Sequence, residues 1–143
     1  MPFVASELTP KKVLVNEART IIDRQETETW KWLDADLLSF LEGGILALER
    51  IRPASGYVGV RRVPRERVEI PEKPEDESDP DEMQGYVDDI DALLAKPVLV
   101  DGRWHQALVE YVCYEAFRRD ESDAASQRLA QQHYQSFVEL SQR

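Results

Sequence analysis

Two adjacent glycines interrupt the strongest helical pattern in the chain, the stretch LLSFLEGGILALERIRP from Leu37 to Pro53. Apolar residues recur there at the spacing of one helix face, and we expect the helix to end at Arg52, because the residue before a proline disfavours helical geometry. Each glycine inside a helix costs about 1 kcal/mol relative to alanine. A helix that accepts two of them needs a compensating contact.

We predict that this contact is made at a packing notch, a shallow patch of small residues on the helix surface. Gly43 and Gly44 lie among the apolar positions of this helix, and Ala47 continues the row of small side chains. Small residues let a second backbone or a large aromatic side chain approach closely. The aromatic residues available to fill the notch are Trp104, Tyr111 and Tyr114.

Three other segments have a helical pattern, which predicts an all-α fold. The first is KKVLVNEARTIIDRQ after Thr9 and Pro10, and the second is GRWHQALVEYVCYEAFRRD, apolar over so much of its girth that we expect it to pack on several sides. The third carries an apolar stripe of Leu129, His133, Phe137 and Leu140, with Ala130 and Tyr134 adjacent, and we expect His133 to be partly buried. We therefore predict one domain, 1–143, with a four-helix bundle core at 9–52 and 101–142.

The segment 53–100 breaks this pattern and is predicted to be a long irregular, partly extended arm between the second and third helices. YVGVRRV and RVEI are consistent with short extended pieces or a hairpin, Pro71, Pro74 and Pro80 argue against regular structure, and VDDIDALLAK predicts one short helix. Connections of this length are usually functional or disordered. We expect the arm to become ordered on a partner.

All of the net charge of −10 lies in one part of this arm. Residues 69–91 contain 11 acidic side chains and one lysine, whereas the rest of the chain has 17 acidic and 17 basic residues. Such a block usually stays solvated. The acidic residues that we single out as arm or channel-facing candidates are Glu75, Asp76, Glu77, Asp79, Asp81 and Glu82.

Six arginines fall within 18 residues just before the acidic block. One interpretation is a solvated loop that pairs with its own carboxylates; the other is docking onto an acidic protein surface, where guanidinium forks bind carboxylates with defined register. Binding to nucleic acid is disfavoured by the adjacent acidic block. The candidate docking residues are Arg61, Arg62, Arg65 and Arg67.

No motif for catalysis, cofactor binding or metal binding appears, so we predict that the protein is not an enzyme and has no cofactor. His105 and His133 lack a second ligand at zinc spacing, and GYVG lacks the lysine of a phosphate loop. Cys113, the single cysteine, is interpreted as a small buried hydrophobe. No apolar run is long enough to span a membrane and no secretory signal is recognised. We therefore expect the protein to work inside the cell or in an assembly that is built inside the cell.

Two stretches together resemble tailed-phage head-to-tail adaptor proteins, also called connector or head-completion proteins. WKWLDADLLSFLEGGILALERIRPAS is similar to the amino-terminal signature of that family, and DGRWHQALVEYVCYEAFRRDESDAASQRLAQQHYQSFVEL to its carboxy-terminal helix pair. The middle of the chain departs from the pattern, because an acidic, proline-rich arm replaces several short β-like segments.

The resemblance implies a structural virion protein at the head–tail junction, assembled in the host cytoplasm. Its copies, usually twelve, would form a ring between the portal protein and the tail or nozzle protein, extend the DNA channel and help retain packaged DNA, without sequence-specific DNA binding and without a membrane.

Two other functions stay open. A small acidic regulatory or inhibitor protein would bind a basic partner or mimic nucleic acid, but it leaves the carboxy-terminal helix pair unexplained. An enzyme acting on a polymer would need two carboxylates held by the folded core. The only pair of that kind is Glu110 and Glu115, for which we expect ordinary salt bridges.

Overall fold

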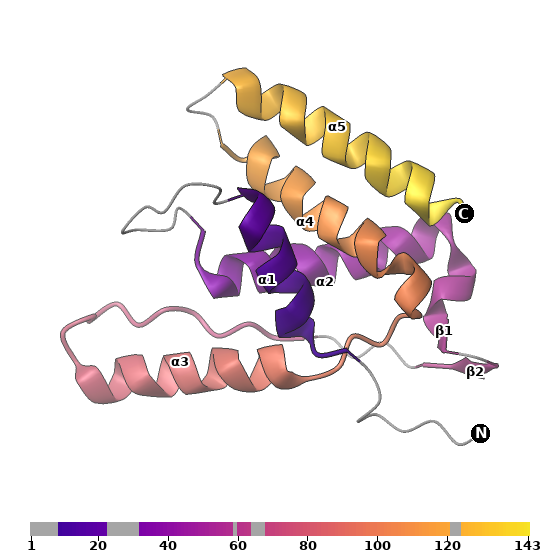
Figure 1. The fold of residues 1–143 in the computed structure, drawn as a ribbon. Helices are drawn as coiled ribbons and strands as arrows, with labels where there is room; N and C mark the ends of the chain where they lie inside the picture. The colour runs from indigo at the N-terminus through magenta and orange to yellow at the C-terminus, as the bar shows by residue number, and fades with distance from the viewer. Residues whose placement is uncertain (1–8, 23–31, 59, 64–67, 121–123) are drawn as a thin grey trace.

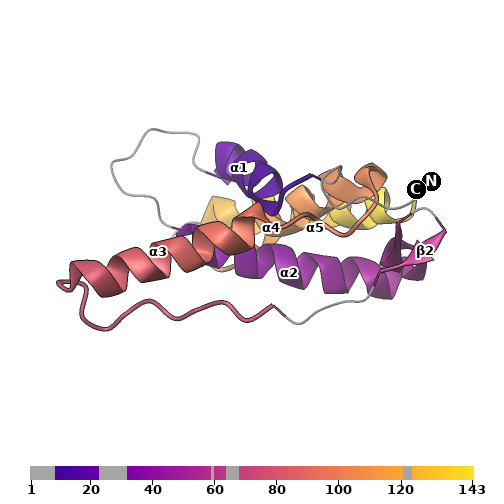
Figure 2. The ribbon, with the colours of Figure 1, turned by 90° about the horizontal axis from the view of Figure 1, so that it is seen from below.

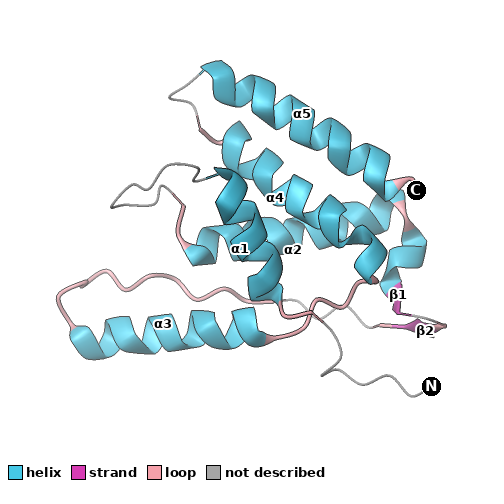
Figure 3. Ribbon diagram, viewed as in Figure 1, coloured by secondary structure: helices cyan, strands magenta, loops and turns pink. Residues whose placement is uncertain are grey.

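The computed structural model describes residues 9–22, 32–58, 60–63, 68–120 and 124–143, and these form an all-α fold (Figures 1 and 3). This confirms the predicted fold class. The helices are α1 (Lys11–Ile22), α2 (Asp34–Ile51), α3 (Pro80–Ala95), α4 (His105–Arg118) and α5 (Ala124–Ser141). Short 3₁₀ turns at Pro53–Gly56 and Gly102–Trp104 and a hairpin of β1 (Tyr57–Val58) with β2 (Arg61–Arg62) complete the described secondary structure.

The helix α4 is the centre of the fold. It packs against α1, α2 and α5, and α5 lies along it in Figure 1. Its buried side chains cover most of its circumference, as the sequence predicted; they are Ala107, Leu108, Val109, Val112, Cys113, Glu115 and Ala116. Because most of the circumference of α4 is buried, α1, α2 and α5 can pack on different sides of it.

The first two helices begin and end close to their predicted limits. In α1, Leu14 and Ala18 are buried, and in α2 the buried face includes Leu37, Leu41 and Leu48. The side chain of Asp36 accepts a hydrogen bond from the backbone N–H of Leu33 at 2.9 Å, so an aspartate within the first turn satisfies the helix start.

Two nearly buried cations connect α1 to α2. The ammonium group of Lys11 donates to Glu42 Oε1 at 2.5 Å. Near the other end of α1, the guanidinium of Arg19 donates to the carbonyl oxygen of Trp32 at 2.9 Å and to Asp34 Oδ1 at 2.5 Å. Both cations are 7% exposed, so each requires its partner in place.

The predicted irregular structure around Pro80 is wrong. Pro80 is the first residue of α3, a 16-residue helix that starts seven residues before the predicted VDDIDALLAK segment. A proline fits the first helical turn because it has no N–H to leave unpaired, and the side chain of Asp79 accepts from the backbone N–H groups of Asp81 and Glu82.

The end of the segment 53–100 belongs to the core and is not an extended arm. Ile90 and Leu94 of α3 are 5% exposed, and Val98 and Val100 are fully buried. The backbone N–H of Val98 donates to the carbonyl of Thr9 at 2.8 Å. These contacts attach α3 to the start of α1. Within the described residues the fold therefore has five helices, where the sequence predicted a four-helix bundle and one short helix in an irregular insertion.

The buried stripe of α5 also differs from the predicted one. Phe137 and Ala130 are buried, together with Ser126 and Ser141, whereas Leu129 is 37% exposed. His133 lies at the edge of the contact with α4. The apolar side chain at position 129 is therefore on the outer side of the helix.

The notch formed by Gly43 and Gly44 holds Tyr111 of the same chain. A Cβ atom at position 44 would lie 2.9 Å from Cδ1, 3.2 Å from Cγ and 3.3 Å from Cβ of Tyr111. At position 43 the nearest atom would be Cε1 of the same ring at an ordinary 3.7 Å. Gly44 is therefore the position that allows α4 to approach α2, and Gly43 only borders the ring.

We predict opposite effects for alanine at the two glycines. Gly44→Ala should lower the free energy of unfolding by about 1–2 kcal/mol, because rotating the Tyr111 ring does not move its Cβ and overpacking exceeds the gain in helix propensity. Gly43→Ala should raise it by up to about 1 kcal/mol. Urea unfolding followed by circular dichroism measures both, and equal effects would contradict the assignment.

Candidate assembly surfaces

Six carboxylates gather around the start of α3, where they form a surface that we call the acidic tip. Its members are the residues singled out from the sequence, Glu75, Asp76, Glu77, Asp79, Asp81 and Glu82. All are exposed except Asp79, which is partly buried as the helix cap. The positive end of the helix macrodipole lies among them and lowers their mutual repulsion.

Local hydrogen bonds hold the acidic tip in shape. Asp76 accepts from the hydroxyl and the backbone N–H of Ser78, and these two bonds lower the pKa of Asp76. Lys73 pairs with Glu77 at 2.8 Å, and this hydrogen bond and charge raise the pKa of Lys73. Both interactions favour the charged forms of the groups that make them.

A second acidic surface runs along α3 itself. Asp88, Asp89 and Asp91 are exposed, while Ile90 and Leu94 on the other side of the helix enter the core. The core contacts thus fix which way these carboxylates point. We call these three residues the α3 acidic face; in the sequence they belong to the acidic block at residues 69–91, and nothing local separates them from the rest of it.

The basic residues lie on the hairpin. Arg61 pairs with Val58 and Arg62 with Tyr57 in the antiparallel ladder, and both arginine side chains are exposed. Val60, between the strands, is fully exposed. Arg65 and Arg67, the other two candidates, lie outside the described residues. We call Arg61 and Arg62 the basic hairpin.

The acidic tip and the basic hairpin are at opposite ends of the molecule. Figures 1 and 2, which are perpendicular views, both place the start of α3 at one end and β2 at the other, with α2 running between. An 18-residue helix is about 27 Å long, well beyond the Debye length of about 8 Å at physiological salt. The acidic tip and the basic hairpin therefore do not pair within one chain; Arg65 and Arg67, which the simpler interpretation also includes, lie outside the described residues.

Arg52, one of the six arginines that precede the acidic block, has a structural role that the sequence did not indicate. Arg52 donates from Nε to the carbonyl of Ser141 at 3.1 Å and from a terminal nitrogen to that of Gln142. Carbonyls at a helix carboxy terminus lack partners in the helix, so this guanidinium closes the end of α5. Arg52 is therefore occupied and is not part of the basic hairpin.

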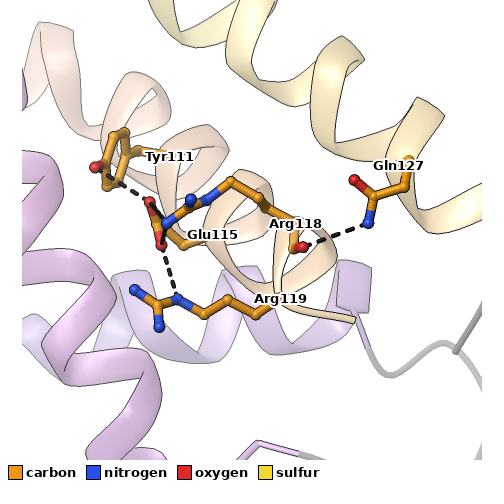
Figure 4. Close-up of polar contacts among 5 residues, drawn as sticks. All are labelled: Tyr111, Glu115, Arg118, Arg119 and Gln127. Carbon is orange, nitrogen blue, oxygen red and sulfur yellow. Dashed lines mark hydrogen bonds and ion pairs between the residues drawn. The ribbon is translucent and has the colours of Figure 1, made fainter. Parts of the chain in front are cut away.

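Of the two core carboxylates considered for catalysis, Glu115 is engaged in ion pairs, as expected, and Glu110 is hydrogen-bonded to His133. Glu115 is 7% exposed, and its Oε2 lies 3.0 Å from Arg118 and 2.9 Å from Arg119, with the Tyr111 hydroxyl 3.4 Å from Oε1 (Figure 4). Glu110 contacts His133 Nδ1 at 2.5 Å. The two carboxylates therefore do not converge on a common partner.

His133 and Cys113 are both held by packing. The His133 ring stacks on Phe117 with centroids 5.4 Å apart, and the predicted partly buried histidine is confirmed. Cys113 is fully buried, which confirms its interpretation as a small hydrophobe, and burial with the nearby charge of Glu110 raises the pKa of its thiol to about 12. Such a thiol is a poor nucleophile.

Within the described ranges, no three His, Cys, Asp or Glu side chains gather in a way that could hold a metal ion. None of the described helices has the length and apolar character needed to cross a membrane. Comparison of the chain with family models, with curated proteins and with solved structures gives no match. The charged surfaces are therefore the features from which a function must be inferred.

The Cys113 thiol should make the protein less stable at alkaline pH. Its pKa is raised in the folded state, so between about pH 8.5 and pH 12 the unfolded chain releases a proton that the folded chain keeps. From about pH 8.5 to about pH 10, the free energy of unfolding should fall by about 2 kcal/mol more in the wild type than in Cys113→Ala. Urea unfolding at the two pH values measures this difference; parallel losses would contradict it.

Proposed function

We propose that this protein is a structural component of a tailed-phage virion, an adaptor subunit that forms a ring between the portal and the tail. The observation that carries the proposal is the α3 acidic face, held outward by a helix whose other side is in the core. A fixed acidic wall suits a channel through which DNA passes, because it repels phosphates and gives them no site to bind.

In this assembly the buried side of α3 packs with α1, α2, α4 and α5 in the body of the ring, and the exposed side of the segment 53–100 contacts neighbours and lines the channel. Ring closure makes weak contacts sufficient, since each copy repeats the same interface. With about twelve copies, the formal charge of the acidic block amounts to on the order of a hundred negative charges around the DNA. The partners are the portal protein on one side of the ring and a tail or nozzle protein on the other.

The direct test is to mix the purified protein with the portal ring of the same phage and to image the product by electron microscopy. The expected result is an added ring of density, coaxial with the portal, that is absent with a portal from an unrelated phage. A chain that stays monomeric and never joins its portal would contradict the proposal. If such a chain instead bound basic proteins, the regulatory or inhibitor function would be favoured.

A second prediction concerns DNA passage. Phage that carry Asp88→Asn, Asp89→Asn and Asp91→Asn should eject DNA more slowly, because removing three charges per copy, about 36 in a dodecameric ring, weakens the repulsion that keeps DNA off the wall. Fluorescence of a DNA-binding dye after receptor addition measures the ejection rate. Glu17→Gln with Glu139→Gln is the matched control, since both side chains are exposed on helices other than α3. Equal rates in all three phages would count against the channel position of α3.

A further inference from the structure

The two charged ends of the molecule are complementary and do not meet within one chain. The acidic tip has six carboxylates, and the one ion pair found among its described residues is Lys73 with Glu77. At the other end, neither guanidinium of the basic hairpin has an ion pair with any residue that the structure describes. Both surfaces are therefore exposed and available.

We propose that copies of this chain join head to tail, with the acidic tip of one copy bound to the basic hairpin of the next. The partner is a second copy because each end carries the charge that the other lacks. Arginine matches this role, since its planar fork binds a carboxylate through two parallel hydrogen bonds and so sets orientation as well as charge. The inference deepens the proposed function, since it names the contact between ring subunits.

The shape of each end favours such a contact. The cap formed by Asp79 and the turn formed by Asp76 with Ser78 hold the carboxylates in place before binding, which reduces the entropy lost on association. On the hairpin, Val60 stands fully exposed beside Arg61 and offers apolar surface at the centre of the charged contact. Exposed ion pairs are individually weak and sensitive to salt, so the association should be weak and should decrease as salt rises.

The arrangement of charge also determines the symmetry of the contact. A two-fold dimer through the acidic tip would place like charges against each other, and the same holds for the basic hairpin. A head-to-tail contact leaves one tip and one hairpin free at the ends of every oligomer, so it repeats until a ring closes or a filament grows. The end-to-end separation seen in Figures 1 and 2 is what such a repeat requires.

Charge reversal at each end tests the proposal. The tip variant carries Glu75→Lys and Glu77→Lys, both outside α3, and the hairpin variant carries Arg61→Glu and Arg62→Glu. In sedimentation velocity at low ionic strength, the wild type should self-associate with rising concentration. In each variant, the dissociation constant for self-association should rise by roughly tenfold or more. Lys12→Glu with Glu17→Lys, exposed on α1, is the matched control and should behave as the wild type.

Mixing the variants separates a lost contact from a misfolded chain. The hairpin variant keeps a native tip and the tip variant keeps a native hairpin, so an equimolar mixture should form dimers and stop there. A wild type that stays monomeric, variants that associate as the wild type does, or a mixture that forms no dimers would each overturn the proposal. Binding of nucleic acid by the wild type in place of self-association would overturn it as well.

The same variants distinguish this contact from the proposed function. If the wild type joins the portal ring and the reversals leave the added ring intact, the head-to-tail assignment fails and the adaptor function stands. If the reversals and their mixture behave as expected but the wild type does not bind the portal, the contact stands and the adaptor function fails.

Discussion

The contact between Tyr111 and the backbone at Gly44 sets how closely α4 approaches α2, and the rest of the fold depends on that distance. Tyr111 also packs edge-on against Phe137 of α5, with ring centroids 5.0 Å apart. One aromatic side chain of α4 thus touches both α2 and α5. Gly44 costs helix propensity, and the close packing of α4 against α2 offsets this cost. A larger residue at position 44 would push the two helices apart and lose that packing.

The charged groups of the protein divide into two kinds with different physical roles. Lys11, Arg19 and Glu115 are nearly buried, and each is paired, because an unpaired charge in the core would cost several kcal/mol. The carboxylates of α3 and of the acidic tip, apart from the helix cap Asp79, are exposed and contribute little to stability. They cluster on α3 and on the turn before it, which is why we propose for them a role in assembly and in the DNA channel.

Much of the fold could be predicted from local patterns. Signals at helix ends predict where α1 and α2 begin and where α2 ends. Periodicity predicts that apolar residues cover most of the circumference of α4. The start of α3 was missed although the sequence SDPDE contains the relevant signal, an aspartate cap followed by proline and two acidic residues; proline was taken only as a helix breaker. Leu129 was assigned to the core because its spacing fits a stripe, but α5 has one main neighbour and turns Ala130 and Phe137 toward it.

The sequence by itself determined which segments are helical, that a notch of small residues interrupts α2, and that all excess charge lies between residues 69 and 91. These properties depend on residues near one another in the chain. Only the tertiary structure decided that Tyr111 fills the notch, that α3 joins the core through Ile90 and Leu94, and that the acidic tip and the basic hairpin face away from each other. The physical reason is that each of these depends on helix packing between residues distant in sequence, for which hydrophobic burial supplies the energy and side-chain shape selects the arrangement.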